Sequence, residues 1–482
     1  MGSPFSPTKA TLEAALHKAL HHLESLDNSP VAARVDLQVL RSRLDKELSE
    51  EGISPEQVVN ELVDDVEGGI LGCAGGRFFG WVVGGTLPAA LAADWLTATW
   101  DQNAALYACG PAAAIVEEVV GRWLKDILGL PVQASFALVS GCQMAHATGL
   151  ACARHELLAR RNWNVEKRGL YGAPPIRILC NDQRHGSVER AVRLLGLGHD
   201  HVMDLPTDST GRIEEHALER ALQEAPSVPT IVLLQAGDIS TGTFDRFNTL
   251  IPLAHHYGAW VHVDGAFGLW AGASPRFRHL LKGIEQADSW TTDGHKWLNV
   301  PFDCGYAFVA NAQAHRDTMS HRAVYLTHDD QARDQIDWNP EWSRRARGFP
   351  TYAAMRQLGR HGISDLIDRC CEHAYNMVSD IGKLPGTEIL FEPVINQGLV
   401  RFLSPAAGAT EQQHDRRTDE VIAAILATGE AFFTGSTWRG KRVMRVSVCN
   451  WRTSKLDVER AVNAIANVLA GKSSNIAAPV AR

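Results

Sequence analysis

The sequence predicts an α/β protein: a large domain with a mostly parallel sheet, a small C-terminal α+β domain and an N-terminal helical arm. Three observations lead to this fold class. Short apolar runs alternate with helical segments in the middle of the chain, which is typical of a parallel sheet. These runs lack polar alternation, so the strands are expected to be buried on both faces. After about residue 350, longer helices and separate strands replace this alternation.

The composition is that of a globular protein, because 45% of the 482 residues are hydrophobic and 21% are charged. There are 47 Lys and Arg residues against 55 Asp and Glu residues, so the formal charge is 47 − 55 = −8. A mildly acidic chain argues against general nucleic-acid binding. The uncharged residues 78–93 contain Gly and Pro, and they are fewer than the roughly 18 apolar residues that a membrane span needs. We therefore expect no nucleic acid and no membrane among the partners.

The N-terminus has no apolar run after a basic start, so no secretory signal is expected. Gly2 and Ser6 match only the loose myristoylation pattern, which Pro4 interrupts. None of the nine cysteines forms a CxxC pair, and Cys370 and Cys371 are adjacent, which suits neither a zinc site nor a disulfide. These features indicate reduced thiols and a cytoplasmic location.

Residues 1–85 are expected to form the helical arm. Apolar residues recur at helical spacing between residues 12 and 20 and again after Pro55. Three histidines on the first helix could share a metal ion, but no Cys or acidic residue with ligand spacing accompanies them. A solvated helix face is therefore favoured for His17, His21 and His22.

The large domain is expected over residues 86–350, and in such sheets ligands bind at the carboxyl ends of the strands. Its expected strands are residues 176–180, 230–235, 259–264 and 305–309, and its expected helices are residues 187–195, 247–257 and 277–284. The small domain is expected over residues 351–482, with helices at 353–384, 419–426 and 455–469 and strands at 398–403 and 442–449. A polar tail follows Gly471.

Three motifs carry chemistry. The first is the run from Asp293 to Trp297, Asp-Gly-His-Lys-Trp, which lies between two predicted strands. A lysine in such a loop can form a Schiff base with an aldehyde when its pKa is lowered. The motif alone is weak, because most lysines are solvent-exposed anchors, so Lys296 needs support from the other two motifs.

The second motif is His262-Val263-Asp264 at the end of a predicted strand, where alternation places His262 and Asp264 on the same face. An acid at this position can pair with the protonated ring nitrogen of pyridoxal phosphate (PLP). The alternatives are a buried structural aspartate and an iron site, since His-x-Asp with a distant His is a facial-triad arrangement. The parallel α/β pattern counts against iron, so we expect no metal.

The third motif is a small-residue turn, Ser140 to His146, before a helix that runs to Leu158. Such a turn offers free backbone N–H groups and the positive end of a helix dipole to a phosphate group. A Ser-Gly pair before a helix is common, so this motif gains weight only from its order with the others.

The order of motifs resembles the PLP-dependent group II amino-acid decarboxylases, the family of aromatic amino-acid, glutamate and cysteine-sulfinate decarboxylases. The resemblance covers about residues 78–358, more than half of the chain, and His-Lys-Trp follows His-Val-Asp by 296 − 264 = 32 residues. The matching motifs are Arg77-Phe78-Phe79 with Pro88, the turn at 140–146, Arg184-His185-Gly186-Ser187, His262-Val263-Asp264-Gly265-Ala266, His295-Lys296-Trp297-Leu298, Pro301-Phe302-Asp303-Cys304, Tyr325-Leu326 and Arg344-Arg345-Ala346-Arg347.

The resemblance implies the large PLP-enzyme fold of the aspartate-aminotransferase type, an intertwined homodimer, and decarboxylation of an L-amino acid to an amine. It implies that Lys296 is the Schiff-base lysine and that Asp264 pairs with the ring nitrogen. It also implies that His185 stacks on the cofactor ring and that Ala266 lines it. His295, Cys142 and Gln143 would hold the phosphate, and Tyr325 or His185 would return a proton to the substrate carbon. The charged residues 327–335 after it are expected to form a mobile surface lid.

The chain departs from the family at several of these positions. Cys142 and Gln143 replace Gly or Ala followed by Ser or Thr, although Gln143 can donate from its amide. Asp293 stands where many relatives have Asn, and we expect its carboxylate to point away from a phosphate or to bond to a backbone amide. Gly265 replaces the usual Ala.

The expected substrate wall also differs, since Trp81, Val82 and Gly84 replace the residues of aromatic decarboxylases. The resemblance therefore does not transfer an aromatic substrate. Alternatives are an aldehyde synthase, an aminotransferase-like enzyme or another lyase, and a non-catalytic relative that no longer binds the cofactor.

Overall fold

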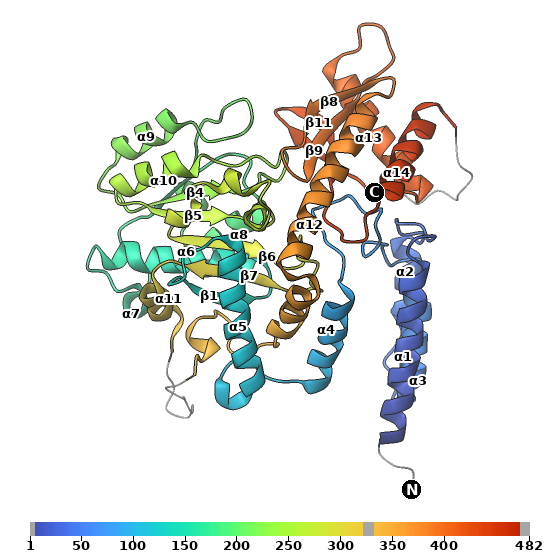
Figure 1. Ribbon diagram of the computed structural model, residues 1–482, viewed down its shortest axis with the longest axis horizontal. Coiled ribbons are helices and arrows are strands. Elements are labelled where there is room, and N and C mark those ends of the chain that lie inside the picture. The colour runs from blue at the N-terminus through green and yellow to red at the C-terminus, as the bar shows by residue number, and fades with distance from the viewer. Residues whose placement is uncertain (1–4, 322–331, 473–482) are drawn as a thin grey trace. The chain divides into compact units, whose positions relative to one another are not determined.

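The computed structural model describes residues 5–321 and 332–472 (Figure 1). The chain divides into two compact units. We call Met1–Val83, Asn376–Leu390 and Leu399–Arg482 the small unit, and Gly84–Tyr375 with Phe391–Gly398 the large unit. Each unit is described by itself below. Among the described residues, no helix is both long enough and apolar enough to cross a membrane.

The large unit is built on a seven-stranded sheet with the order β1-β7-β6-β5-β4-β2-β3. Its strands are β1 (Ser135–Val139), β2 (Arg177–Cys180), β3 (Val202–Asp204), β4 (Thr230–Gln235), β5 (Trp260–Asp264), β6 (Ser289–Asp293) and β7 (Gly305–Val309). The neighbouring strands β3, β2, β4, β5 and β6 pair in parallel, whereas β7 is antiparallel to β6 and β1. The mostly parallel sheet predicted from the sequence is confirmed.

Helices and 3₁₀ turns connect these strands. The helices are α4 (Pro88–Trp100), α5 (Pro111–Leu128), α6 (Cys142–Ala159), α7 (Val165–Arg168), α8 (Gly186–Leu194), α9 (Glu215–Glu224), α10 (Phe247–His256), α11 (Ala312–Met319) and α12 (Gly348–Gly382), whose residues from Asn376 onward belong to the small unit. The 3₁₀ turns are η1 (Tyr107–Cys109), η2 (His199–His201), η3 (Gly268–Ala273), η4 (Arg278–Leu281), η5 (Ile284–Gln286) and η6 (Gln335–Asp337).

The helix predicted at residues 277–284 is wrong, because the chain forms the separate turns η4 and η5 there. Gly283 lies between them with a φ of 90°, in the left-handed region that favours glycine. A Cβ atom at this position would lie 2.6 Å from the Cα atom of Asn248. The close approach to the start of α10 therefore interrupts the helical pattern that the apolar spacing indicates.

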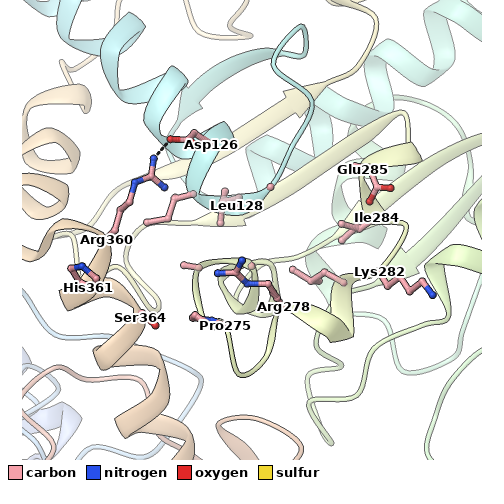
Figure 2. A pocket seen from close by; sticks show the side chains of 15 residues that line it. Asp126, Leu128, Pro275, Arg278, Lys282, Ile284, Glu285, Arg360, His361 and Ser364 are labelled. Atoms are coloured by element: carbon pink, nitrogen blue, oxygen red, sulfur yellow. Dashed lines mark hydrogen bonds and ion pairs between the residues drawn. The ribbon is translucent and has the colours of Figure 1, made fainter.

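A cavity of about 590 Å³ opens where α5 ends beside the 3₁₀ turns and α12 (Figure 2). Three cations lie on its wall, of which Arg360 pairs with Asp126. The labelled residues of Figure 2 that line it are Asp126, Leu128, Pro275, Arg278, Lys282, Ile284, Glu285, Arg360, His361 and Ser364. None of the described residues predicted to form the catalytic site lies among its lining residues.

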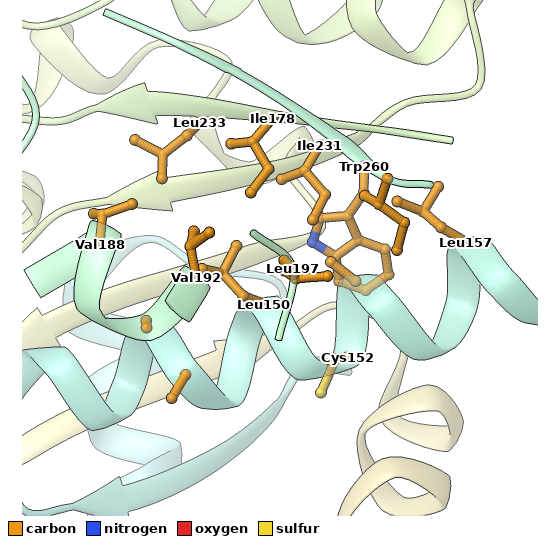
Figure 3. Close-up of a cluster of buried hydrophobic side chains, with 14 of the residues drawn as sticks. Leu150, Cys152, Leu157, Ile178, Val188, Val192, Leu197, Ile231, Leu233 and Trp260 are labelled. Atoms are coloured by element: carbon orange, nitrogen blue, oxygen red, sulfur yellow. The ribbon is translucent and has the colours of Figure 1, made fainter. Parts of the chain in front are cut away.

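A buried apolar cluster holds α6 against the sheet (Figure 3). Leu150 and Leu157 of α6 pack in it with Trp260 of β5, and residues of β2, β4 and α8 complete it. All five residues of β5 are buried, so both faces of the sheet are covered there. This packing sets the start of α6 beside the carboxyl ends of β5 and β6.

The small unit contains α1 (Phe5–Ser25), α2 (Leu37–Leu44), α3 (Pro55–Val66), α13 (Glu411–Thr428) and α14 (Lys455–Leu469). Its sheet has the order β10-β11-β9-β8, formed by β8 (Thr387–Phe391), β9 (Gln397–Phe402), β10 (Thr434–Trp438) and β11 (Lys441–Ser447). The predicted arm helices are confirmed, and α1 packs on α3. The helix predicted at 419–426 is longer in the structure, because the capping box of Thr410 and Gln413 starts α13 earlier.

The Arg77-Phe78-Phe79 motif anchors the small unit internally. The buried Arg77 guanidinium donates to the carbonyl oxygens of Ser29 at 2.7 Å and Glu430 at 2.8 Å. The ring of Phe78 stacks on that of Phe432 with centroids 4.4 Å apart. These contacts give the motif a structural role, joining segments that are more than 350 residues apart in the chain.

Candidate active site

The carboxyl ends of β5 and β6 and the start of α6 form one polar cluster in the large unit. Asp264 ends β5, Asp293 ends β6, and Cys142 begins α6. The backbone N–H of Cys142 donates to the Asp293 carboxylate at 3.2 Å, and His146, one turn further along α6, lies 3.5 Å from the Asp264 carboxylate. Lys296 follows in the loop after β6. The structure thus brings together the three motifs that carry chemistry in the sequence.

Asp264 is a buried carboxylate held at both oxygens. One oxygen accepts the backbone N–H of Ala266 at 3.1 Å, and the other lies 3.5 Å from Nε2 of His146. Burial raises the pKa of a carboxyl group, but the charges of His146 and Lys296 and the Ala266 hydrogen bond hold the pKa of Asp264 well below its ordinary value. Asp264 is therefore ionised, and each of its oxygens has a lone pair left for a ligand.

Lys296 lies in a tight loop between β6 and β7. Its ammonium nitrogen is 5.5 Å from the centroid of the Phe267 ring, and its side chain is half-buried. The N–H of Gly84 donates to the carbonyl of His295 at 3.0 Å, and the N–H of Gly85 donates to the Asn299 side chain at 2.6 Å. The segment that starts at Gly84 thus holds the lysine loop in place.

We expect Gly84→Ala to displace this loop. A Cβ atom at position 84 would lie 2.5 Å from the carbonyl oxygen of His295 and closer still to that of Lys296. Overpacking of this kind costs about 1–3 kcal/mol in free energy of unfolding. Thermal denaturation measures this loss, and Gly52→Ala is the control because a Cβ atom there meets nothing within 4 Å. Equal stability of the two variants would contradict the tight packing.

His295 presents an unused nitrogen. Its Nδ1 bonds to the carbonyl of Val300 at 2.8 Å, and its buried Nε2 has no partner among the described residues. Burial and the nearby charge of Lys296 lower the pKa of His295 to about 4, although the Val300 carbonyl raises it. A buried nitrogen without a partner points to a ligand, because such atoms are normally hydrogen-bonded.

The turn before α6 leaves space for an anion. A Cβ atom on Gly141 would meet only the Asp293 carboxylate, at 4.0 Å. As early residues of the helix, Gln143 and Met144 have backbone N–H groups without intrahelical acceptors. The Asp293 carboxylate accepts the backbone N–H groups of Cys142 and His295, which is one of the two outcomes expected from the sequence. Burial raises the pKa of Asp293. Part of the helix N-terminus is thus taken by a carboxylate, and the rest is open.

The remaining predicted site residues lie as follows. Ala266 is half-buried two residues after Asp264. His185 is exposed and caps α8, with its Nδ1 accepting the N–H of Ser187 at 3.2 Å. Tyr325 lies outside the described residues. The end of the predicted lid is not mobile surface, because Asp334 and Gln335 are buried and Asp334 accepts the N–H of Tyr107 at 2.9 Å.

His146 closes the third sequence motif, but no role for its side chain was predicted from the sequence. Its Nδ1 lies 3.0 Å from Nε2 of His262, and the other nitrogen of His262 lies 2.7 Å from the Ser289 hydroxyl. His262 and Asp264 do share a face, as predicted, since both contact His146. Both ring nitrogens of His262 lie within hydrogen-bond distance of a partner in the protein.

These residues fit the PLP that the resemblance implies. Asp264 offers an ionised carboxylate for a protonated ring nitrogen, and Lys296 offers an amine on the neighbouring loop. The orphan Nε2 of His295 and the open space before Gly141 suit an anionic group. The donor set therefore fits PLP.

Comparisons with known proteins agree with this fit. The pyridoxal-dependent decarboxylase conserved domain matches residues 38–403. The chain is 27% identical over 447 residues to an aromatic-L-amino-acid decarboxylase of Bacillus atrophaeus, covering 91% of each chain. It is 24% identical over 464 residues to a phenylacetaldehyde synthase of Petunia hybrida, covering 92% of this chain and 91% of the relative.

The fold also matches solved structures. The crystal structure of Oryza sativa TDC with PLP and tryptamine superposes with a TM-score of 0.91 at 22% identity, covering 98% of this chain and 100% of the other. At this identity the match shows the fold, which is the PLP-dependent decarboxylase architecture expected from the sequence. With the family domain spanning most of its length, the chain belongs to the pyridoxal-dependent decarboxylase family and is a PLP-dependent carboxy-lyase of amino acids.

Proposed function

We propose that this chain decarboxylates an aromatic L-amino acid to the corresponding amine, with Lys296 and Asp264 at the centre of the site. The observation that carries the proposal is the ionised, buried Asp264 at the end of β5 with Lys296 on the adjacent loop. In the reaction, the bond between the α-carbon and the carboxylate breaks, carbon dioxide leaves, and one proton is added to the α-carbon. When bound, PLP supplies the sink for the electron pair that remains.

Each residue has a defined task in this proposal. Lys296 holds the cofactor through its amine, and Asp264 accepts a hydrogen bond from the ring nitrogen and keeps it protonated. His295 with Cys142 and Gln143 surrounds the phosphate. Ala266 and His185 cover the two faces of the ring, which requires His185 to act from its position at the start of α8. Residues 86–350 form the cofactor-binding domain.

An aromatic substrate is the class that the curated relatives support, because the Bacillus atrophaeus relative acts on aromatic L-amino acids and aligns over 91% of this chain. The test is a comparison of kcat/KM for carbon dioxide release from L-tryptophan, L-tyrosine, L-glutamate and L-cysteine sulfinate. The proposal predicts a preference of at least about tenfold for an aromatic substrate, equivalent to about 1.4 kcal/mol. Faster release from an acidic substrate would contradict it.

We also propose that the chain acts as a homodimer in the cytoplasm. The nine cysteines form no disulfide, which supports a reducing compartment. The dimer follows from the family resemblance, in which the loop after Tyr325 completes the neighbouring site. Mixing Lys296→Ala with Tyr325→Phe protein tests it: shared sites restore amine output in hybrid dimers, which neither variant gives alone, and a monomeric mass in light scattering would contradict the dimer.

A second candidate function, aldehyde formation, is favoured by the phenylacetaldehyde synthase relative. That reaction releases carbon dioxide and needs molecular oxygen, which is reduced to hydrogen peroxide. Water supplies the carbonyl oxygen as the α-carbon becomes an aldehyde and the amino group leaves as ammonia. Tyr325 distinguishes the two outcomes in our proposal, because its phenol protonates the α-carbon before oxygen can react.

We therefore expect Tyr325→Phe to convert amine output to aldehyde output. The change keeps the ring and removes only the proton, so oxygen uptake should rise from background to a level matching carbon dioxide release. An oxygen electrode and product chromatography measure this. Tyr171→Phe is the control, since Tyr171 is 99% exposed. Unchanged amine output without oxygen uptake in Tyr325→Phe would show that another group donates the proton.

A further inference from the structure

The described residues contain a buried polar chain that the proposed catalytic steps do not use. It runs from Trp260 on β5 through Ser289 on β6 and His262 on β5 to His146 on α6, and it ends at Asp264. Trp260 Nε1 donates to the Ser289 hydroxyl at 2.9 Å, and Ser289 lies 2.7 Å from His262 Nδ1. His262 Nε2 lies 3.0 Å from His146 Nδ1. The side chains of both histidines are fully buried.

The chemistry of its two ends limits this series of hydrogen bonds to two arrangements of protons. The indole N–H of Trp260 can only donate, so it occupies one lone pair of the Ser289 oxygen. Asp264 is ionised and can only accept. In one arrangement Ser289 donates to His262, His262 donates to His146, and His146 donates from Nε2 to Asp264. In the other, His146 donates from Nδ1 to His262 and carries a second proton on Nε2.

Both arrangements place an N–H of His146 toward Asp264. The remaining tautomer would aim the Nε2 lone pair at the carboxylate, which is repulsive. Burial lowers the pKa of His146, but Asp264 and Cys142 outweigh this effect and raise it to about 10. Burial and the charge of His146 lower the pKa of His262 to about 3, so His262 stays neutral. The 3.5 Å contact of His146 with Asp264 is thus an ion pair.

The backbone of α6 makes room for this arrangement. Gly149 follows His146 by one turn, and a Cβ atom there would lie 2.7 Å from Cε1 and 2.9 Å from Nδ1 of His262. The imidazole of His262 can therefore reach His146 only because position 149 has no side chain. The same helix that supplies His146 leaves the space for its support.

We propose that His146, supported by His262 and Ser289, is the positioning residue that orients the Asp264 carboxylate toward the ring nitrogen of PLP and keeps it ionised. The inference rests on the proposed function, in which Asp264 faces that nitrogen. His146 acts through Asp264 and touches neither substrate nor cofactor. Ala266 fixes one oxygen of the carboxylate and His146 the other, so the plane of the group is set from both sides.

The test compares His146→Phe with a matched control, His315→Phe. His315 is equally buried, and its Nδ1 lies 2.8 Å from a serine hydroxyl, that of Ser135. His146→Phe should bind PLP about tenfold more weakly in equilibrium dialysis, and kcat should fall about 30-fold while KM stays within about twofold. His315→Phe should keep the affinity and kcat of the wild type. Equal losses in both variants would overturn the positioning role.

A double-mutant cycle separates positioning from general packing. If His146 acts through Asp264, adding His146→Phe to Asp264→Asn should change PLP affinity by less than about twofold. A further tenfold loss in the double variant would overturn the inference. If His146→Phe does not fold, Ser289→Ala replaces it. We expect this variant to lose about threefold in PLP affinity, and Asp264→Asn should again suppress the loss. An unchanged PLP affinity in Ser289→Ala would contradict the positioning role.

The cofactor-free protein supplies an independent readout. Nitrogen-labelled histidine should give slowly exchanging ring N–H signals from His146, which disappear in His146→Phe and persist in His315→Phe. Absence of such a signal would contradict the buried N–H. This readout and PLP affinity remain valid if the holoprotein releases no carbon dioxide, so failure of the proposed function is distinguishable from failure of the inference.

Discussion

Replacing Lys296 with alanine is expected to abolish covalent attachment of PLP and to lower turnover by about 10³-fold or more. The lysine lies on the loop between β6 and β7. Its charge helps to lower the pKa of Asp264 and opposes the burial that raises the pKa of Asp293. Its amine is therefore near enough for its charge to act on the carboxylate that pairs with the ring nitrogen in our proposal. No other lysine stands in a His-Lys-Trp context in the sequence.

The measurement is mass spectrometry of peptides after borohydride reduction, with an absorption spectrum of the same sample. Wild-type protein should carry one reduced cofactor adduct, on Lys296. Lys282→Ala is the matched control, because Lys282 belongs to the same unit but lines the cavity of Figure 2 instead. It should retain the adduct and full turnover. An adduct on any other lysine of the wild-type protein would remove Lys296 from the centre of the site.

Asp264→Asn is expected to keep the fold and lose about 10²-fold or more in kcat. An amide has no charge to hold the ring nitrogen protonated, and each pKa unit of that preference is worth about 1.4 kcal/mol, or tenfold. Several units are reasonable for a buried group. The substitution also removes the charged carboxylate that raises the pKa of His146.

The control for this variant is Asp288→Asn. Asp288 precedes β6, at the opposite end of the strand from Asp293, and accepts the N–H of Val261 at 2.7 Å. This variant should keep a kcat close to that of the wild type, and any loss should be confined to its free energy of unfolding. Circular dichroism checks the fold of both variants. Turnover by Asp264→Asn within a few-fold of the wild type would show that another group pairs with the ring nitrogen.

The apolar runs of β2, β4, β5 and β7 predicted these strands from the sequence, whereas β6 was not predicted. The sequence of β6, Ser-Trp-Thr-Thr-Asp, has the polar character of a loop. It is buried because its hydroxyls find partners on β5: Ser289 bonds with His262, and Thr291 donates to the carbonyl of Val263 at 3.4 Å. Such partners exist only once the two strands pair, so propensity alone does not predict the strand.

The site divides in the same way. Lys296, Asp264 and the turn at Cys142 could be found because each belongs to a local motif: a loop between two predicted strands, the end of a predicted strand and the start of a predicted helix. His146 could not, because its partner His262 is 116 residues away in the sequence. The available signals were that His146 follows Cys142 by one helical turn and that His262 shares a face with Asp264. Only the packing of α6 on the sheet joins them.

The central claim is that PLP bound at Lys296 removes carbon dioxide from an amino acid and leaves an amine. Incubation of the holoprotein with a panel of carboxyl-labelled L-amino acids, with both products quantified, tests it most directly. We predict that the preferred substrate yields labelled carbon dioxide and amine in equal amounts without oxygen uptake, and that Lys296→Ala yields neither. PLP-loaded protein that releases no labelled carbon dioxide from any amino acid in the panel would contradict the claim.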